Sequence, residues 1–216
     1  MNGQIQYESR GTLTSGTTSA DRPLAAGAAS ADTEFVRRLG QFRHDVRRLA
    51  SPPARAELQR LVDMARELHL EDTTISDELA EIRASFEALD LADQIARGDL
   101  PFVVSLEPLP QGEACHFVTP VRFGRRRNDQ FGHLELTTSW LRFHGALDVS
   151  VVWPAIANVQ RTGRDVIVSL VDSRRLFRFC CHAVTEAARA AVVAAYLANV
   201  ARVREADSGN PQPAAL

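Results

Sequence analysis

The stretch from Phe131 to Val159, FGHLELTTSWLRFHGALDVSVVWPAIANV, constrains the fold of this 216-residue chain more than any other. Apolar and polar side chains alternate over residues 131–137, and they alternate again over residues 140–144. A period of two residues is typical of a β-strand that buries one face. The stretch therefore predicts two adjacent strands, with leucine and phenylalanine inward and polar residues outward.

A two-residue turn at 138–139 would join these strands into a hairpin. That turn pairs Glu135 with Arg142 and His133 with His144, and the pair of opposite charges favours this register. Thr-Ser is not a preferred hairpin turn, so a longer loop remains an alternative.

The rest of the C-terminal half is also typical of short strands. Pro154 predicts a break in the ladder after a third strand that ends near Trp153. Further strands are expected at 118–123, 166–171 and 176–181, and an Ala-rich helix at 185–204.

This pattern resembles the GRAM and bacterial pleckstrin-homology-like group over roughly residues 112–204. The residues that match are Gly132-x-Leu134-x-Leu136-Thr137-x-x-x-Leu141-x-Phe143-x-Gly145 and then Trp153-x-x-Ile156-x-x-Val159. The resemblance implies a bent, seven-stranded antiparallel sheet barrel that is capped by a C-terminal helix. It also implies binding of phosphoinositides, other anionic lipids or protein segments rather than catalysis.

The N-terminal half lies outside that pattern and predicts a helical hairpin or bundle over residues 32–100, with Asp32 as the first N-cap. Apolar side chains recur at helical spacing in three short helices, which must pack on each other or on another surface to be stable. We therefore expect an α+β protein: a helical segment, then a pleckstrin-homology-like domain at 101–205. Disordered tails are expected at 1–31, which is rich in Ser, Thr, Gly and Ala, and at 206–216.

The two halves carry opposite charge. Residues 32–100 contain 10 Arg and 15 Asp or Glu, a formal charge of −5, whereas residues 101–204 contain 13 Arg and 8 Asp or Glu, a formal charge of +5. The helices could pair their own basic and acidic flanks, or the Arg-rich first helix could lie on an anionic membrane or nucleic acid. The net charge of −2 for the whole chain argues against a dedicated nucleic-acid-binding protein.

Arginines supply the candidate binding site. All 25 basic residues are Arg, and guanidinium groups bind phosphate in a bidentate manner. The resemblance implies phosphate contacts from the first strand and its following loop, where the candidates are Arg122, Arg125, Arg126 and Arg127, and a later turn could add Arg174 and Arg175. Binding of an anionic headgroup, binding of a protein segment, and a merely solvated turn are the three alternatives.

Nothing in the sequence points to a cofactor, a metal or an enzyme. His133, Glu135 and His144 share one strand face, but Arg142 among them opposes a cation. Three cysteines, two of them adjacent, form neither a disulfide framework nor a C-x-x-C metal motif, which favours a reducing cytosol. Abundant Ala and the absence of Lys suggest a GC-rich, bacterial genome.

We therefore expect a non-catalytic adaptor in the cytoplasm or at the inner face of the membrane. Its β domain would engage a protein segment or an anionic lipid headgroup, and helices 32–98 would supply oligomerisation or a second partner surface. The alternative is an autoinhibited regulatory or stress-response component, in which the acidic helices cover the basic sheet.

Overall fold

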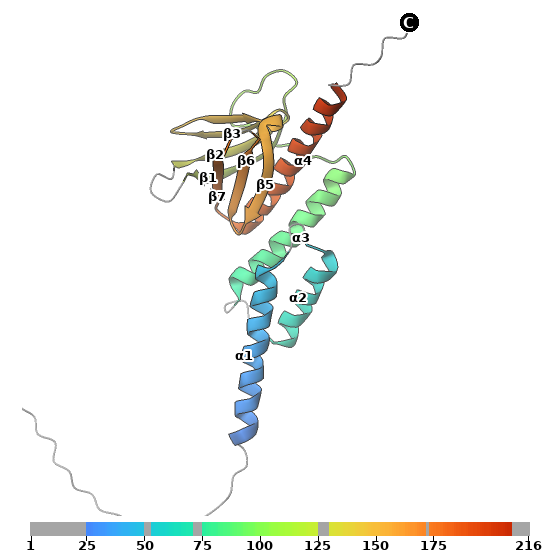
Figure 1. Cartoon of the computed structure of the whole chain (residues 1–216), viewed down its shortest axis with the longest axis vertical. Coiled ribbons are helices and arrows are strands. Elements are labelled where there is room, and N and C mark those ends of the chain that lie inside the picture. Colours follow the sequence, from blue (N-terminus) through green and yellow to red (C-terminus); the bar gives the residue numbers. More distant parts are fainter. Residues whose placement is uncertain (1–24, 50–52, 71–74, 125–129, 172, 209–216) are drawn as a thin grey trace, which may run out of the picture. The chain divides into compact units, whose positions relative to one another are not determined.

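The computed structural model describes residues 25–49, 53–70, 75–124, 130–171 and 173–208 (Figure 1). Within these ranges the elements are α1 (Ala25–Arg47), α2 (Arg55–Glu67), α3 (Ser76–Ala96), β1 (Cys115–Phe123), β2 (Gln130–Thr137), β3 (Trp140–Gly145), β4 (Val149–Val152), the 3₁₀ turn η1 (Trp153–Ala155), β5 (Ile156–Thr162), β6 (Asp165–Leu170), β7 (Leu176–Cys181) and α4 (Val184–Ser208).

The chain divides into two units, Met1–Arg37 and Arg38–Leu216. In the first unit, α1 begins at Ala25, so the expectation that Asp32 caps its start is wrong. The physical reason is the run AAGAASA, because alanine is the strongest helix former and lets the helix extend backwards. The remainder of the expected N-terminal tail, residues 1–24, lies outside the described residues.

In the second unit, the helical segment has an apolar core of its own. Phe42, Leu58, Leu61 and Ile75 are fully buried, and Ile82 is nearly so. These side chains come from α1, α2 and α3, and Ile75 lies just before α3. The predicted apolar stripes therefore pack against each other within one chain. Burial of each such side chain stabilises the packing by about 1.5–3 kcal/mol.

Ion pairs connect the same helices at their surface. Arg43 of α1 lies 3.1 Å from Glu78 of α3, and Arg55 of α2 lies 2.8 Å from Asp90 of α3. Basic and acidic flanks are therefore paired internally, as one of the two alternatives from the sequence expected. Such exposed pairs contribute at most about 1 kcal/mol each, so the apolar core holds the helices together.

The seven strands form one antiparallel sheet in the order β4-β3-β2-β1-β7-β6-β5. Glu135 pairs with Arg142 and His133 with His144, so the predicted hairpin register and the two-residue turn at 138–139 are confirmed. The chain leaves the ladder after β4 at η1, where Pro154 was expected to break it.

The inner face of the sheet packs around large apolar side chains. Leu134, Leu136, Leu141 and Phe143 of the hairpin are fully buried. Trp153 is also buried, and its indole Nε1–H donates a hydrogen bond of 2.9 Å to the carbonyl of Thr137. This bond satisfies the one polar group that the tryptophan takes into the core.

Helix α4 covers the open side of the bent sheet (Figure 1). Its buried residues are mostly small, with Ala187, Ala190 and Ala194 at or near zero exposure. Small side chains let the helix backbone approach the sheet closely. Helix α3 lies beside α4 and adds Leu91 and Ile95 to the same core.

The chain is therefore an α+β protein with a helical segment, a seven-stranded antiparallel sheet and a C-terminal helix, as the sequence predicted. Among the described helices, none combines the length and the hydropathy needed to cross a membrane.

Gly132 and Gly145 face each other across the hairpin beneath the ring of Phe143. A Cβ built on Gly132 would lie 2.7 Å from that ring. We expect Gly132→Ala to lower the free energy of unfolding by about 1–3 kcal/mol, because the core must shift to admit the methyl group. Chemical denaturation measures this change. The control is Gly40→Ala, where nothing lies within 4 Å; a similar loss there would contradict the interpretation.

A substitution at Leu91 tests whether α3 is part of the sheet domain. It is 6% exposed and belongs to the core that α4 and the strands form. We expect Leu91→Ala to lower the free energy of unfolding by about 2–5 kcal/mol and to broaden the amide signals of β-strand residues. A loss confined to the α1–α2 signals in hydrogen exchange would contradict this assignment.

Candidate functional site

The end of β1 and two connections lie at one end of the sheet. Phe123 at the end of β1 pairs with Phe179, and the amide of Gly124 donates to the carbonyl of Arg178, so the β6–β7 turn lies just beyond the end of β1. Gly132 pairs with Gly145, which brings the β3–β4 connection to the end where β2 begins. We call this region the loop end. It comprises the end of β1 and the connections β3–β4 and β6–β7.

The loop end receives some of the candidate arginines but not all. Arg174 and Arg175 are exposed in the β6–β7 turn. Residues 125–127, which hold three further candidates, lie outside the described residues. Arg122 pairs with Cys180, five residues after Arg175, which corresponds to about 16 Å of strand. The structure therefore does not bring Arg122 together with the pair at the turn.

Exposed apolar side chains accompany the arginines at the loop end. Leu147 in the β3–β4 connection is 58% exposed, and Val171 and Leu176 around the β6–β7 turn are 58% and 54% exposed. Sequence reasoning missed these residues, because strand alternation assigned Leu176 to the sheet and gave no reason to expect apolar tips. Val171 and Leu176 end the two predicted strands on either side of residues 172–175, and that position was the one available signal.

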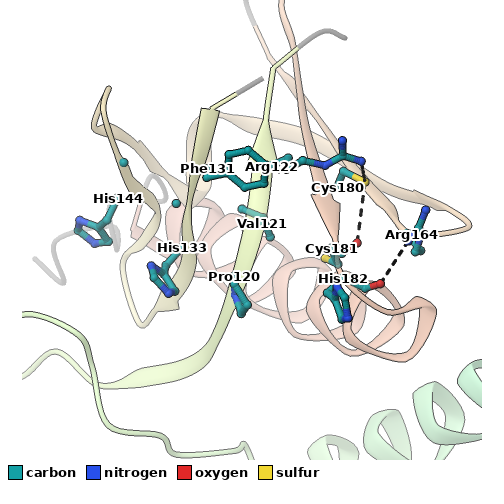
Figure 2. A pocket seen from close by; sticks show the side chains of 12 residues that line it. Pro120, Val121, Arg122, Phe131, His133, His144, Arg164, Cys180, Cys181 and His182 are labelled. Atoms are coloured by element: carbon teal, nitrogen blue, oxygen red, sulfur yellow. Dashed lines mark hydrogen bonds between the residues drawn. The ribbon is translucent and has the colours of Figure 1, made fainter. Parts of the chain in front are cut away.

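A groove lies on the outer face of the sheet, away from α4 (Figure 2). Its volume is about 720 Å³, and it runs over β1, β2, β3 and the end of β7. Pro120 pairs with His133, which in turn pairs with His144, so these three side chains form a row across the strands. Phe131 and Arg122 form the next row, followed by Cys180.

The other part of the outer face is covered by an extended strap, residues 101–107. The amide of Val103 donates to the carbonyl of Cys115, which fixes the strap beside β1. Beneath it, Glu135 and Thr137 are fully buried. The expectation that the outward positions of β2 are solvated is therefore wrong for these two residues.

Glu135 is the centre of a polar cluster under the strap. One carboxylate oxygen accepts a hydrogen bond from the Ser105 hydroxyl, and the other lies 3.1 Å from His144 Nε2. Burial by itself would favour the neutral acid, but these hydrogen bonds outweigh burial and lower the pKa of Glu135 below its usual value. The buried residue is therefore a carboxylate that anchors the strap.

The cluster does not have the geometry of a hydrolytic triad. Ser105 contacts the carboxylate rather than the imidazole, so His144 has no direct contact with a serine oxygen as general base. Burial raises the pKa of Cys115 to about 11 and that of Cys181 to about 12, which keeps these thiols protonated and poorly nucleophilic. In the described part of the chain, no three histidine, cysteine or carboxylate side chains are grouped so that they could hold a metal ion.

No family model and no curated protein matches this sequence. Among solved structures, the chain is similar to the C-terminal domain of an unknown protein from Leishmania infantum, with 14% identity, a TM-score of 0.30, and coverage of 44% of this chain and 85% of that one. It is also similar to the linker-DH/PH domains of p115-RhoGEF, with 11% identity, a TM-score of 0.36, and coverage of 68% of this chain and 47% of that one.

A mutant of the DH/PH domains of p115-RhoGEF gives a similar result, with 11% identity, a TM-score of 0.37, and coverage of 74% of this chain and 50% of that one. The chain thus spans about half the length of these two DH/PH structures. The strand order and the terminal helix define the fold of this part of the chain.

The lowered pKa of Glu135 predicts a pH-dependent contribution to stability. Because the folded pKa is below the unfolded value of about 4.3, the stabilisation is complete above that value and is lost as the pH falls through the folded pKa. We expect Glu135→Gln to lower the free energy of unfolding by about 1–3 kcal/mol at neutral pH and by less in acid. Denaturation over a pH series measures both quantities.

The matched control for this experiment is Glu107→Gln, since the Glu107 side chain is 62% exposed at the end of the same strap. It should change stability by less than about 0.5 kcal/mol. If Glu135→Gln lowers the free energy of unfolding by the same amount at neutral pH and in strong acid, the assignment of a buried carboxylate is contradicted.

Proposed function

We propose that this chain is a non-catalytic binding protein whose pleckstrin-homology-like domain attaches to an anionic membrane surface through the loop end. The helical segment then presents a second partner surface. The site of action would be the cytoplasmic face of the membrane. Membership of the GRAM group is part of the proposal, and the burial of its pattern residues supports it: Leu134, Leu136, Leu141, Phe143, Trp153 and Ile156 are all 0–1% exposed.

The observation that carries this proposal is the combination of side chains at the loop end. Arg174 and Arg175 are exposed next to Val171 and Leu176, two apolar residues that are more than half exposed on either side of them. Exposed apolar side chains of a turn can enter the boundary between lipid headgroups and acyl chains, while arginines bind the headgroup phosphates. A solvated turn needs neither the apolar residues nor their position beside the charges.

A protein segment is a second candidate ligand, supported by the strap. Its outward side chains Phe102, Val104 and Leu106 are apolar and 76%, 86% and 51% exposed. An extended segment with such a row offers a surface to which a partner strand can add. This candidate places the partner on the strap rather than on the loop end.

Regulation by the helical segment is a further candidate. The acidic helix α3 forms an ion pair between Glu81 and Arg161 of β5, and it packs against α4. The apolar stripes of α2 and α3 are largely buried within the chain, whereas Phe35 and Val36 of α1 are 43% and 66% exposed. A partner or a second copy would therefore meet these two residues or the polar faces of the helices. Autoinhibition would require that α3 leave this position when a ligand binds.

Vesicle flotation tests the membrane proposal. We expect the full chain to float with vesicles that contain phosphatidylglycerol or a phosphoinositide and not with phosphatidylcholine alone. The double variant Arg174→Glu/Arg175→Glu should bind anionic vesicles at least about tenfold more weakly. Each arginine near an anionic surface contributes about 1 kcal/mol to the binding free energy, and changing its charge from positive to negative doubles the loss. Replacing Arg125, Arg126 and Arg127 by Ala should weaken flotation as well.

The matched control, Arg83→Glu/Arg189→Glu, reverses the charge of two exposed arginines on helices. It changes the net charge by the same amount as Arg174→Glu/Arg175→Glu. Flotation that falls by the same factor in the control would show that only net charge matters. Flotation that is absent, or unchanged in Arg174→Glu/Arg175→Glu, would remove the membrane proposal.

A further inference from the structure

The groove on the outer face of the sheet has a basic lining at one end. Its described lining includes Arg122 from β1, Arg164 from the β5–β6 turn and His182 after β7, and no carboxylate (Figure 2). Phe131 lies beside Arg122 and is 78% exposed. A large apolar ring this exposed, next to cations in a hollow, suits a ligand that is both acidic and apolar.

Sheet register explains why these residues meet. Arg122 pairs with Phe131 on one side and with Cys180 on the other, and the three side chains point outward in one row. The pairing of β1 with β7 covers only Val121–Phe123, after which β7 ends and the chain turns into α4. The hollow forms where the two strands part.

Nearby groups hold the cations in place. Arg122 donates to the Cys180 sulfur at 3.4 Å, and Arg164 donates to the carbonyl of His182 at 3.4 Å. A guanidinium has five N–H donors, so the bond to His182 orients Arg164 and leaves it able to meet a carboxylate. Both arginines are exposed.

Two carboxylates on elements next to the basic end, Asp165 and Glu186, have partners of their own. Asp165, which pairs with Cys180 in the sheet, forms an ion pair with Arg178. Glu186 in the first turn of α4 accepts a hydrogen bond from the amide of Ala183 at 3.1 Å. The charge of Asp165 is therefore balanced by Arg178, and Glu186 is held at the start of α4.

We propose that this groove is a docking site for an extended acidic segment of a partner protein. Carboxylates of the segment contact Arg122 and Arg164, and an apolar side chain packs on Phe131 and Pro120. A bilayer surface is a poor occupant, because it is flat and the site is hollowed into the sheet face. The row of Arg122 and Cys180 is about 16 Å of strand from Arg175 in the β6–β7 turn, so one chain can hold a membrane through Arg174 and Arg175 and a partner here.

The probe is a fluorescein-labelled peptide that alternates glutamate with leucine, titrated with the full chain and followed by anisotropy. A matched peptide has glutamine in place of glutamate. We expect the glutamate peptide to bind at least about tenfold more tightly, since charge-assisted bonds to arginine are the stronger kind. Arg164→Glu should weaken its binding by at least about tenfold, Arg122→Gln by less, and Phe131→Ala should also weaken it.

The control variant is Arg174→Glu/Arg175→Glu, which should keep peptide affinity within about twofold while it loses flotation. Conversely, Arg164→Glu should float normally with anionic vesicles. Each variant is checked by thermal unfolding. The groove proposal would be overturned if the two peptides bind equally, or if Arg164→Glu leaves peptide affinity unchanged. It would also be overturned if Arg164→Glu and Arg174→Glu/Arg175→Glu lose peptide affinity equally. Loss of flotation in Arg164→Glu would show that the groove meets the membrane instead, which also overturns it.

Discussion

The register of the β2–β3 hairpin is the constraint on which the rest of the sheet domain depends. Glu135 lies opposite Arg142, and this alignment sends Leu134 and Leu136 inward with Phe143. A slip of one residue would turn every side chain of a strand to the other face. The close contact of Gly132 with the Phe143 ring prevents such a slip, because another residue there would not fit.

The same register gives the outer face two different surfaces. Near the turn, the strap covers Glu135, whose carboxylate bonds to Ser105 and His144 and so holds the strap in place. Farther along, beyond the strap, His133 and Phe131 are exposed and border the groove. One face of a single sheet is thus a buried anchor at one end and an accessible surface at the other.

Much of the fold could be predicted from the sequence because its causes are local. Alternation located β2 and β3, Pro154 marked the break at η1, and the Ala-rich run gave α4. The site was predicted less well. Strand spacing could not show that Arg122 faces Cys180 of β7, since that pairing joins residues far apart in the chain. It also could not show that apolar residues such as Leu147 would sit at the loop end with Arg175.

By itself the sequence determined most of the strands and helices, the hairpin register and most residues of the inner core, because side-chain period and turn position act over a few residues. Only the tertiary structure decided that the strap covers Glu135, that α3 completes the core with Leu91, and that β1 and β7 part to leave a groove. These features depend on where distant segments pack, and a polar residue such as Glu135 is equally compatible with solvent or with a covering segment that satisfies its hydrogen bonds.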